Sequence, residues 1–307
     1  MAKRKNTTSK SRESREHAHR RPPFFATVTI ILVLIVLYAT GLDGQLMDII
    51  DGIGQPSYSH VPGEGLYVRF LDVGKADSML IVCDGETMLV DAGELETAGY
   101  VVDYLKRAGV RTLDAIVATH PHSDHIGGMA SAIEEFNPII SYISPKTHNT
   151  NTYLRMMAAL DINGGEVIVP KPGERYQLGG ADIEFVAPHM DYDEINDCSL
   201  VFVLEYQGIR IMFTGDAQSD SEKDMRESGL RLDADVLKVG HHGSNTSSKK
   251  AFLQEVSPRY AIITQADIAD SSDKVLDRLA DINAQVYSTD NGVIILSVEG
   301  GVIKISQ

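Results

Sequence analysis

The segment Thr-His-Pro-His-Ser-Asp-His-Ile-Gly-Gly, residues 119–128, is the most informative part of this 307-residue chain. It follows the apolar run 113–118, which predicts a buried strand. Its metal-competent side chains are His120, His122, Asp124 and His125. A loop that leaves a strand end can direct alternate side chains into one pocket, so we expect the first two to point together and the other two to serve a neighbouring site. Imidazole and carboxylate donors suit Zn, Mn or Fe.

A second strand ends in a carboxylate that could belong to the same site. Asp216 follows the predicted strand 209–213 and the pair Thr214-Gly215. A carboxylate buried at such a point is costly unless it meets a cation. Asp216 could instead cap a helix, but beside the first motif we interpret it as a carboxylate that bridges two metals.

A third strand, predicted over 235–239, ends in the adjacent histidines His241 and His242. One of them can complete the second metal site. The other can donate a hydrogen bond to a substrate oxyanion or protonate a leaving group. Ser244, Thr246 and the backbone N–H groups before the next helix could bind an anion.

The composition restricts the class of protein. Hydrophobic residues make up 43% of the chain, enough for the core of one large domain or two modest ones. The net charge is −15, so tight non-specific binding to duplex DNA is not expected, although bound metals could still attract a phosphate substrate. Cys83 and Cys198 provide neither a disulfide framework nor a cysteine zinc site. They are two buried thiols or, in an exported domain, a single bridge.

The N-terminal region is predicted to be a tail followed by a membrane anchor. Residues 1–23 carry eight lysines and arginines against two glutamates, which predicts a disordered cytoplasmic tail. Residues 24–42 are apolar and uncharged, and as a helix they would span roughly 28 Å, close to a bilayer core. Because the basic flank comes first, we expect a single-pass anchor in the cell membrane with the C-terminal domain outside.

A cleaved signal peptide is the alternative interpretation of the apolar segment. Ala39-Thr40-Gly41 offers small residues at a suitable cleavage site, and cleavage would make the domain secreted. Residues 43–64 are rich in Gly, Pro, Ser and Asp and are interpreted as a linker in either case.

From residue 65 to the C-terminus, strands and helices alternate in two similar halves. In the first half, three predicted strands within 66–91 precede helix–strand units that lead into 119–128. In the second half, strands within 183–213 precede further helix–strand units. Two such halves would pack their sheets face to face with helices outside. The sequence therefore predicts an α/β fold, an αββα sandwich, over residues 65–307.

These motifs together resemble the metallo-β-lactamase superfamily, and within it the hydrolase domain of the ComEC family of DNA-uptake competence proteins. The segments that carry the second likeness are 70–77, 90–93, 196–201 and 234–244. The resemblance runs from about residue 66 to the C-terminus and implies a hydrolase with two divalent metal ions, Zn or Mn. It implies as ligands His120, His122, Asp124, His125, Asp216 and His241. It also implies that Asp91 steadies a ligand histidine and that Asp77 lies in a turn close to the site.

The chain departs from the family pattern at three places. Many members carry a histidine just before the strand that leads to Gly-Asp, where this chain has Asn196 and Asp197. One metal would therefore be held by one of these residues, or loosely, with the upstream His189 a weaker substitute. A His-Pro pair before the penultimate helix is replaced by Asp270-Ser271. One apolar span stands in place of a many-helix channel, so DNA transport by this chain itself is not expected.

The expected mechanism follows from two cations bridged by Asp216. Water shared between them loses a proton near neutral pH, and the resulting hydroxide attacks phosphorus or a carbonyl. Asp124 and His242 are the expected catalytic residues, with His242 assisting in the transition state. The ComEC likeness favours a phosphodiesterase or nuclease that acts on nucleic acid or a phosphodiester-linked wall polymer. Two alternatives are an ester or lactone hydrolase of the same fold and a non-catalytic binding domain tethered at the surface.

Overall fold

The computed structural model describes residues 63–163 and 165–307, all of which belong to one folding unit, Pro56–Gln307. The predicted tail and anchor, residues 1–42, lie outside the described residues, as does nearly all of the linker. Within the part of the chain that is described, no helix is both long and apolar enough to cross a membrane.

The first sheet, counted over the described residues, has eight strands in the order β15-β14-β1-β2-β3-β4-β5-β6. They are β1 (Leu66–Phe70), β2 (Met79–Cys83), β3 (Glu86–Val90), β4 (Ala115–Ala118), β5 (Ile140–Ile143), β6 (Glu166–Ile168), β14 (Ile294–Glu299) and β15 (Val302–Ser306). β1 pairs antiparallel with β2 and β14, whereas β3 to β6 run parallel. The C-terminal hairpin therefore completes the sheet of the N-terminal half.

The second sheet has seven strands among the same residues, in the order β13-β12-β11-β10-β9-β8-β7. They are β7 (Arg175–Leu178), β8 (Ala181–Ala187), β9 (Val201–Tyr206), β10 (Ile209–Phe213), β11 (Val236–Lys238), β12 (Tyr260–Ile263) and β13 (Gln285–Ser288). The strands β7 to β10 are antiparallel, and β10 to β13 are parallel. Both sheets thus combine an antiparallel part with a parallel part.

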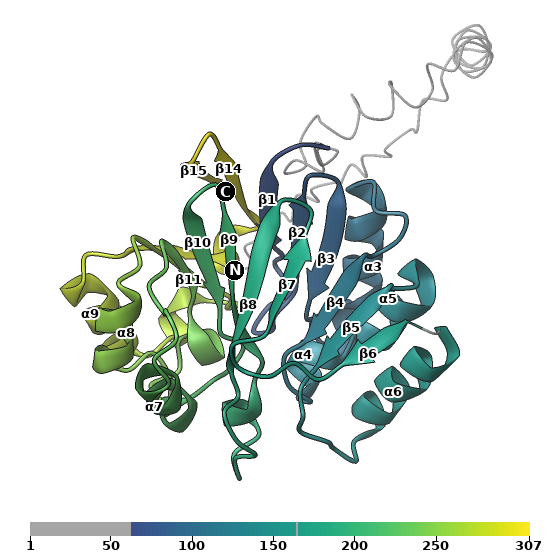
Figure 1. The fold of residues 1–307 in the computed structure, drawn as a ribbon, viewed down its shortest axis with the longest axis horizontal. Helices are drawn as coiled ribbons and strands as arrows, with labels where there is room; N and C mark the ends of the chain where they lie inside the picture. Colours follow the sequence, from purple (N-terminus) through teal and green to yellow (C-terminus); the bar gives the residue numbers. More distant parts are fainter. Residues whose placement is uncertain (1–62, 164) are drawn as a thin grey trace, which may run out of the picture. The chain divides into compact units, whose positions relative to one another are not determined.

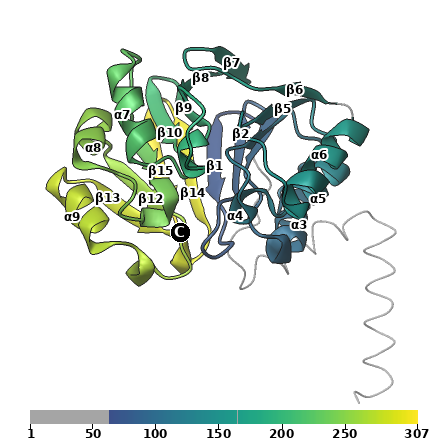
Figure 2. The same cartoon turned by 90° about the horizontal axis from the view of Figure 1, so that it is seen from below.

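Helices cover the outer face of each sheet (Figure 1; Figure 2). On the first sheet these are α3 (Ala98–Arg107), α5 (Met129–Phe136) and α6 (Asn151–Asn163); on the second they are α7 (Ser219–Glu227), α8 (Lys250–Val256) and α9 (Asp273–Asp281). One apolar layer lies between the sheets, where Phe70 of β1 stacks on Phe213 of β10, and one lies under each group of helices. The predicted αββα sandwich is confirmed.

Three strands of this sandwich run directly into the expected motifs. β4 leads to His120, β10 leads to Asp216, and β11 leads to His241. The first of these strands belongs to one sheet and the other two to the second sheet, so both halves of the chain supply polar residues to one edge of the sandwich. Cys83 and Cys198 are buried free thiols, so the alternative of a bridge between them is not supported.

Candidate metal centre

Two glycines allow the motif after β4 to approach the loop after β3. The short helix α4 (Ser123–Ile126) is followed by Gly127 and Gly128. A Cβ atom on either glycine would lie 2.4 Å from a backbone atom of the loop after β3. Only glycine fits such a close approach. The consequence is that His125, on α4, lies next to Asp91.

Asp91 fixes the ring of His125. Its Oδ2 lies 2.7 Å from His125 Nδ1, and Thr119 donates to Oδ1 from its backbone N–H (2.9 Å) and to Oδ2 from its hydroxyl (2.7 Å). All three residues are buried. Because Nδ1 is engaged with Asp91, Nε2 is the atom that can exchange a proton for a metal, and it lies 3.2 Å from Asp216 Oδ1.

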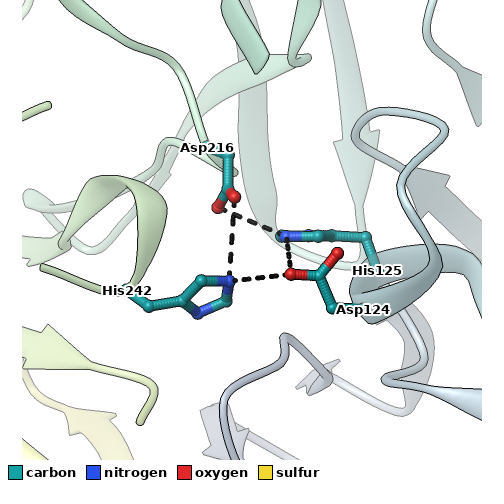
Figure 3. Close-up of side chains that lie close together, drawn as sticks. All are labelled: Asp124, His125, Asp216 and His242. Carbon is teal, nitrogen blue, oxygen red and sulfur yellow. Dashed lines mark ion pairs between the residues drawn. The ribbon is translucent and has the colours of Figure 1, made fainter. Parts of the chain in front are cut away.

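Four residues form what we call the inner donor group: Asp124, His125, Asp216 and His242. Their donor atoms lie within 4.8 Å of one another, and Figure 3 shows the side chains converging. His242 Nε2 is 3.4 Å from Asp124 Oδ2 and 3.7 Å from Asp216 Oδ2. Among the described residues, the buried atoms that make no hydrogen bond include His125 Nε2, His242 Nε2 and Asp216 Oδ1. Buried polar atoms without partners are costly, so this donor set fits a divalent cation.

A second set, the outer donor group, consists of His120, His122, His241 and Asn196. His120 Nε2 lies 3.1 Å from His122 Nδ1 and 3.9 Å from Asp216 Oδ2. His241 Nε2 lies 3.8 Å from Asp216 Oδ2 and 3.5 Å from Asn196 Nδ2. Asn196 Oδ1 is buried and makes no hydrogen bond. Asp216 of the inner group therefore also faces His120 and His241, so the two groups share this carboxylate.

Burial and neighbouring charges set the protonation of these donors. Burial lowers the pKa of His120 well below its ordinary value and also lowers the pKa of His241, so both rings are neutral, as a metal ligand must be. Burial also opposes charge in the inner group, but there the charged neighbours outweigh it. They hold the pKa of Asp216 and of Asp124 below the usual range and that of His125 well above it. The carboxylates of the inner group are thus ionised.

The adjacent histidines occupy a tight turn with unusual backbone angles. His241 has φ of 49° and His242 has φ of 51°, both in the left-handed region that non-glycine residues rarely adopt. The two rings consequently have different partners. His241 Nδ1 contacts the Thr246 hydroxyl at 2.9 Å, and His242 Nδ1 donates to the Thr264 carbonyl at 2.9 Å.

This turn bears on the roles expected for the histidine pair. From the sequence, His241 was the expected ligand and His242 the expected catalytic residue. In the structure the Nε2 atoms of both rings face Asp216, and it is His242 that lies with Asp124 and His125. Its placement suits a ligand.

Asn196 and Asp197, which stand where the family resemblance implied a histidine, make different contacts. Asn196 faces His241, as described above. Asp197 points elsewhere, because its Oδ1 accepts hydrogen bonds from the backbone N–H groups of Gln218 and Ser221 at 2.9 and 3.0 Å, at the start of α7. His189 belongs to neither donor group. Asp197 therefore anchors a helix next to the site.

Two serines support the histidine turn. Ser244 Oγ lies 3.0 Å from the Thr246 hydroxyl that contacts His241. Ser271, where the resemblance implied part of a His-Pro pair, places its Oγ 3.4 Å from the His242 carbonyl oxygen. A Cβ on Gly243 would lie 2.8 Å from that Oγ, so the turn packs tightly on Ser271.

Several residues behind the donors were not expected from the sequence. They are Thr119, Lys238 and Thr264, and the contact of Thr246 with His241 was also not expected. The threonines carry no local signal, because each acts through a contact made by folding. Lys238 does carry one, since it is a charged residue within the apolar run Val-Leu-Lys-Val that begins with β11, and the structure buries it completely beside Asp77.

Comparisons with known proteins agree with this architecture. The family model of the metallo-beta-lactamase superfamily matches residues 71–264. Among solved structures, CmlA, a diiron beta-hydroxylase from Streptomyces venezuelae, superposes with a TM-score of 0.51 at 14% identity, over 78% of this chain and 55% of that chain. At this identity the likeness is one of fold.

Two curated relatives are competence-related proteins. ComE operon protein 3 of Bacillus subtilis (strain 168) is 29% identical, over 90% of this chain and 39% of that protein. Competence protein ComA of Neisseria gonorrhoeae is 29% identical, over 78% of this chain and 33% of that protein. The chain thus spans between a third and two fifths of the length of these relatives.

Proposed function

The chain belongs to the metallo-β-lactamase superfamily, whose fold indicates a metal-dependent hydrolase, and on this premise we propose that its reaction is the cleavage of phosphodiesters. The observation that carries the proposal is the position of Asp216 between the inner and outer donor groups. A carboxylate in that place can serve two cations at once, which is the arrangement used in many phosphodiester hydrolases.

The two donor groups would hold one cation each. The inner cation would be bound by Asp124, His125 and His242, and the outer cation by His120, His122 and His241, with Asp216 shared. Asn196 would stand in for the missing third histidine of the outer position. When bound, such cations lower the pKa of coordinated water and offset the negative charge gained at phosphorus.

The protein's own residues orient these donors and set the charge of the site. Asp91 holds the ring of His125, and the Thr264 carbonyl holds the ring of His242. We propose that His242 is a ligand and not the catalytic donor expected from the sequence, because its Nδ1 is engaged and its Nε2 faces Asp124 and Asp216.

The charge balance favours an anionic substrate despite the acidic body of the chain. Asp91, Asp124 and Asp216 bring three negative charges to the site, and two divalent cations bring four positive charges. The loaded site would carry a net positive charge, which attracts a phosphodiester more strongly than a neutral ester. The likeness to competence proteins favours nucleic acid over a wall polymer.

We further propose that residues 24–42 attach the domain to the outer face of the cell membrane. The basic residues before this segment and its uncharged apolar composition support an anchor. The mass of the mature protein tests this point: an intact N-terminus supports the anchor, and loss of about the first 40 residues supports a cleaved signal peptide.

The full-length chain, purified in mild detergent and loaded with Zn²⁺ or Mn²⁺, provides the test of the reaction. We expect about two metal equivalents by elemental analysis and metal-dependent cleavage of bis(p-nitrophenyl) phosphate and of single-stranded DNA. Asp124→Ala should abolish cleavage, whereas His148→Ala, a histidine outside both donor groups, should not. Cleavage restricted to carboxylic esters or lactones would contradict the proposal. Bound metal without turnover of any substrate would support the binding-domain alternative.

A further inference from the structure

Asp77 and Lys238 form a buried ion pair that joins the two sheets behind the inner donor group. Asp77 lies in the loop between β1 and β2, and Lys238 is the last residue of β11. Lys238 Nζ is 2.5 Å from Asp77 Oδ2, and neither side chain is exposed. Because side chains alternate along a strand, Lys238 points the same way as Val236, into the apolar layer between the sheets. A lysine in that position needs a specific partner.

Asp77 is connected to three members of the inner group. Its backbone N–H donates to the Asp124 carbonyl at 3.1 Å. Its Oδ1 accepts the Thr264 hydroxyl and lies 3.5 Å from His242 Nδ1, the atom that donates to the Thr264 carbonyl. Its Oδ2 lies 3.8 Å from His125 Nδ1. Movement of Asp77 would therefore disturb donors on both sheets.

Lys238 also reaches the fourth member of the group. Its Nζ donates to the Gly215 carbonyl at 3.4 Å, directly before Asp216. Its own carbonyl accepts the Thr214 hydroxyl at 2.7 Å, which ties the same turn to β11. The ammonium group thus contacts both the turn that presents Asp216 and the carboxylate that supports His242.

Asp77 could be mistaken for a metal ligand, since it clusters with Asp91 and His125. The ammonium of Lys238 argues against this role, because a fixed positive charge at Asp77 Oδ2 would repel a cation there. Without Lys238, however, Asp77 would be a buried carboxylate free to compete for the inner cation.

We propose that Lys238 is a positioning residue that neutralises and clamps Asp77, and so keeps the inner donors of the two sheets in register for a cation. The proposal rests on the proposed function only in that the inner group binds a metal. A lysine that merely stabilised the fold would affect unfolding but would leave metal affinity unchanged.

The test measures Zn²⁺ affinity of the full-length chain by competition with a chromophoric chelator. Lys238→Met keeps the length of the side chain and removes its charge, and we expect the first Zn²⁺ equivalent to bind about 10- to 100-fold more weakly, the usual effect of losing a residue that supports a ligand. Arg210→Met is the matched control. Arg210 is a buried basic residue of β10, paired with Glu205 at 2.6 Å and bonded to backbone carbonyls, but it supports no donor.

Both variants should lower the melting temperature, and only Lys238→Met should weaken Zn²⁺ binding. Unchanged Zn²⁺ affinity in folded Lys238→Met would overturn the proposal. If that variant does not fold, the double variant Asp77→Asn, Lys238→Met replaces it, because removal of both charges leaves no buried unpaired charge. We expect it to regain stability while Zn²⁺ affinity stays at least about tenfold weaker.

Recovery of Zn²⁺ affinity together with stability in the double variant would also overturn the proposal, since the ion pair would then be structural only. These outcomes are independent of the substrate. A chain that cleaves no phosphodiester but loses Zn²⁺ affinity in Lys238→Met would contradict the proposed reaction and leave the role of Lys238 in place.

Discussion

The inner and outer donor groups share Asp216 but are supported very differently. The histidines of the inner group have their second ring nitrogen held by buried acceptors, Asp91 and the Thr264 carbonyl. In the outer group, His241 is held by the hydroxyl of Thr246, its side chain is 27% exposed, and Asn196 is a neutral donor. Charge and support both favour the inner position. From this difference we expect an inner cation to bind firmly and an outer cation to exchange more readily.

The largest effect is expected where the two groups meet. Asp216→Asn removes the charge that both positions share, so we expect loss of both metals and a fall in kcat/KM of at least about 10³-fold, equivalent to several kcal/mol. His122→Ala should lose only the outer equivalent. Elemental analysis of both variants measures this difference. If Asp216→Asn still held two metal equivalents tightly, Asp216 would not be the carboxylate that the two groups share.

The support of the histidine turn should depend on pH through Glu222. This buried residue of α7 accepts the backbone N–H groups of Ser248 and Lys249, which end the loop that carries the turn. Burial raises the pKa of Glu222 from 4.5 to about 7. The folded chain thus holds this proton more tightly than the unfolded chain. The stability contributed by the protonated group is full below about pH 4.5 and is lost as the pH rises to about 7.

Glu222→Gln should remove this pH dependence. We expect the unfolding free energy of the native chain, relative to that of the variant, to fall by about 3 kcal/mol between pH 4.5 and pH 7, an order-of-magnitude value from the pKa difference. Urea unfolding at several pH values measures it. Parallel pH profiles for the two chains would show that Glu222 does not titrate in this range.

Asn196 offers a way to reduce the contrast between the groups. Asn196→His would supply the imidazole that the outer position lacks, and we expect the second Zn²⁺ equivalent to bind about tenfold more tightly, since imidazole is a better zinc donor than an amide. Asn196→Ala should weaken it. Zinc titration with a competing chelator distinguishes the two. Equal affinity in all three chains would mean that Asn196 is not part of the outer position.

The smallest effect is expected at Thr246. Thr246→Val keeps the shape of the side chain but removes the hydroxyl that contacts His241 Nδ1. We expect the second Zn²⁺ equivalent to bind roughly tenfold more weakly or less, at the low end for residues that support a ligand, with the first equivalent unchanged. A larger loss at the first equivalent would place His241 in the inner position.

The order of strands and helices could be predicted from apolar periodicity because most elements bury one face. Two strands, β6 and β7, were missed. Each has at most four residues, and each exposes a charged side chain, Glu166 in β6 and Arg175 in β7. Short edge strands of this kind lack the apolar pattern on which the prediction depends.

The candidate ligands were predictable because each lies in a short motif directly after a predicted strand, as at 119–128, Asp216 and His241. The motif after β4 is a continuous stretch of the chain, so its candidate ligands could be recognised together. The assignment of His241 and His242 to different groups depends on backbone angles that a pair of identical residues does not reveal. The pairing of Asp77 with Lys238 depends on how the sheets face each other, which no local pattern encodes.

The left-handed turn at His241 and His242 has one further consequence. His241, whose ring faces the outer position, and His242, whose ring faces the inner one, are joined by one peptide bond. When a cation fixes one imidazole, it also restricts the backbone torsions available to the other, so occupancy of the first position lowers the entropy lost in filling the second. We therefore expect the outer position to bind zinc more tightly once the inner position is filled, so that a variant that loses the first equivalent also weakens the second.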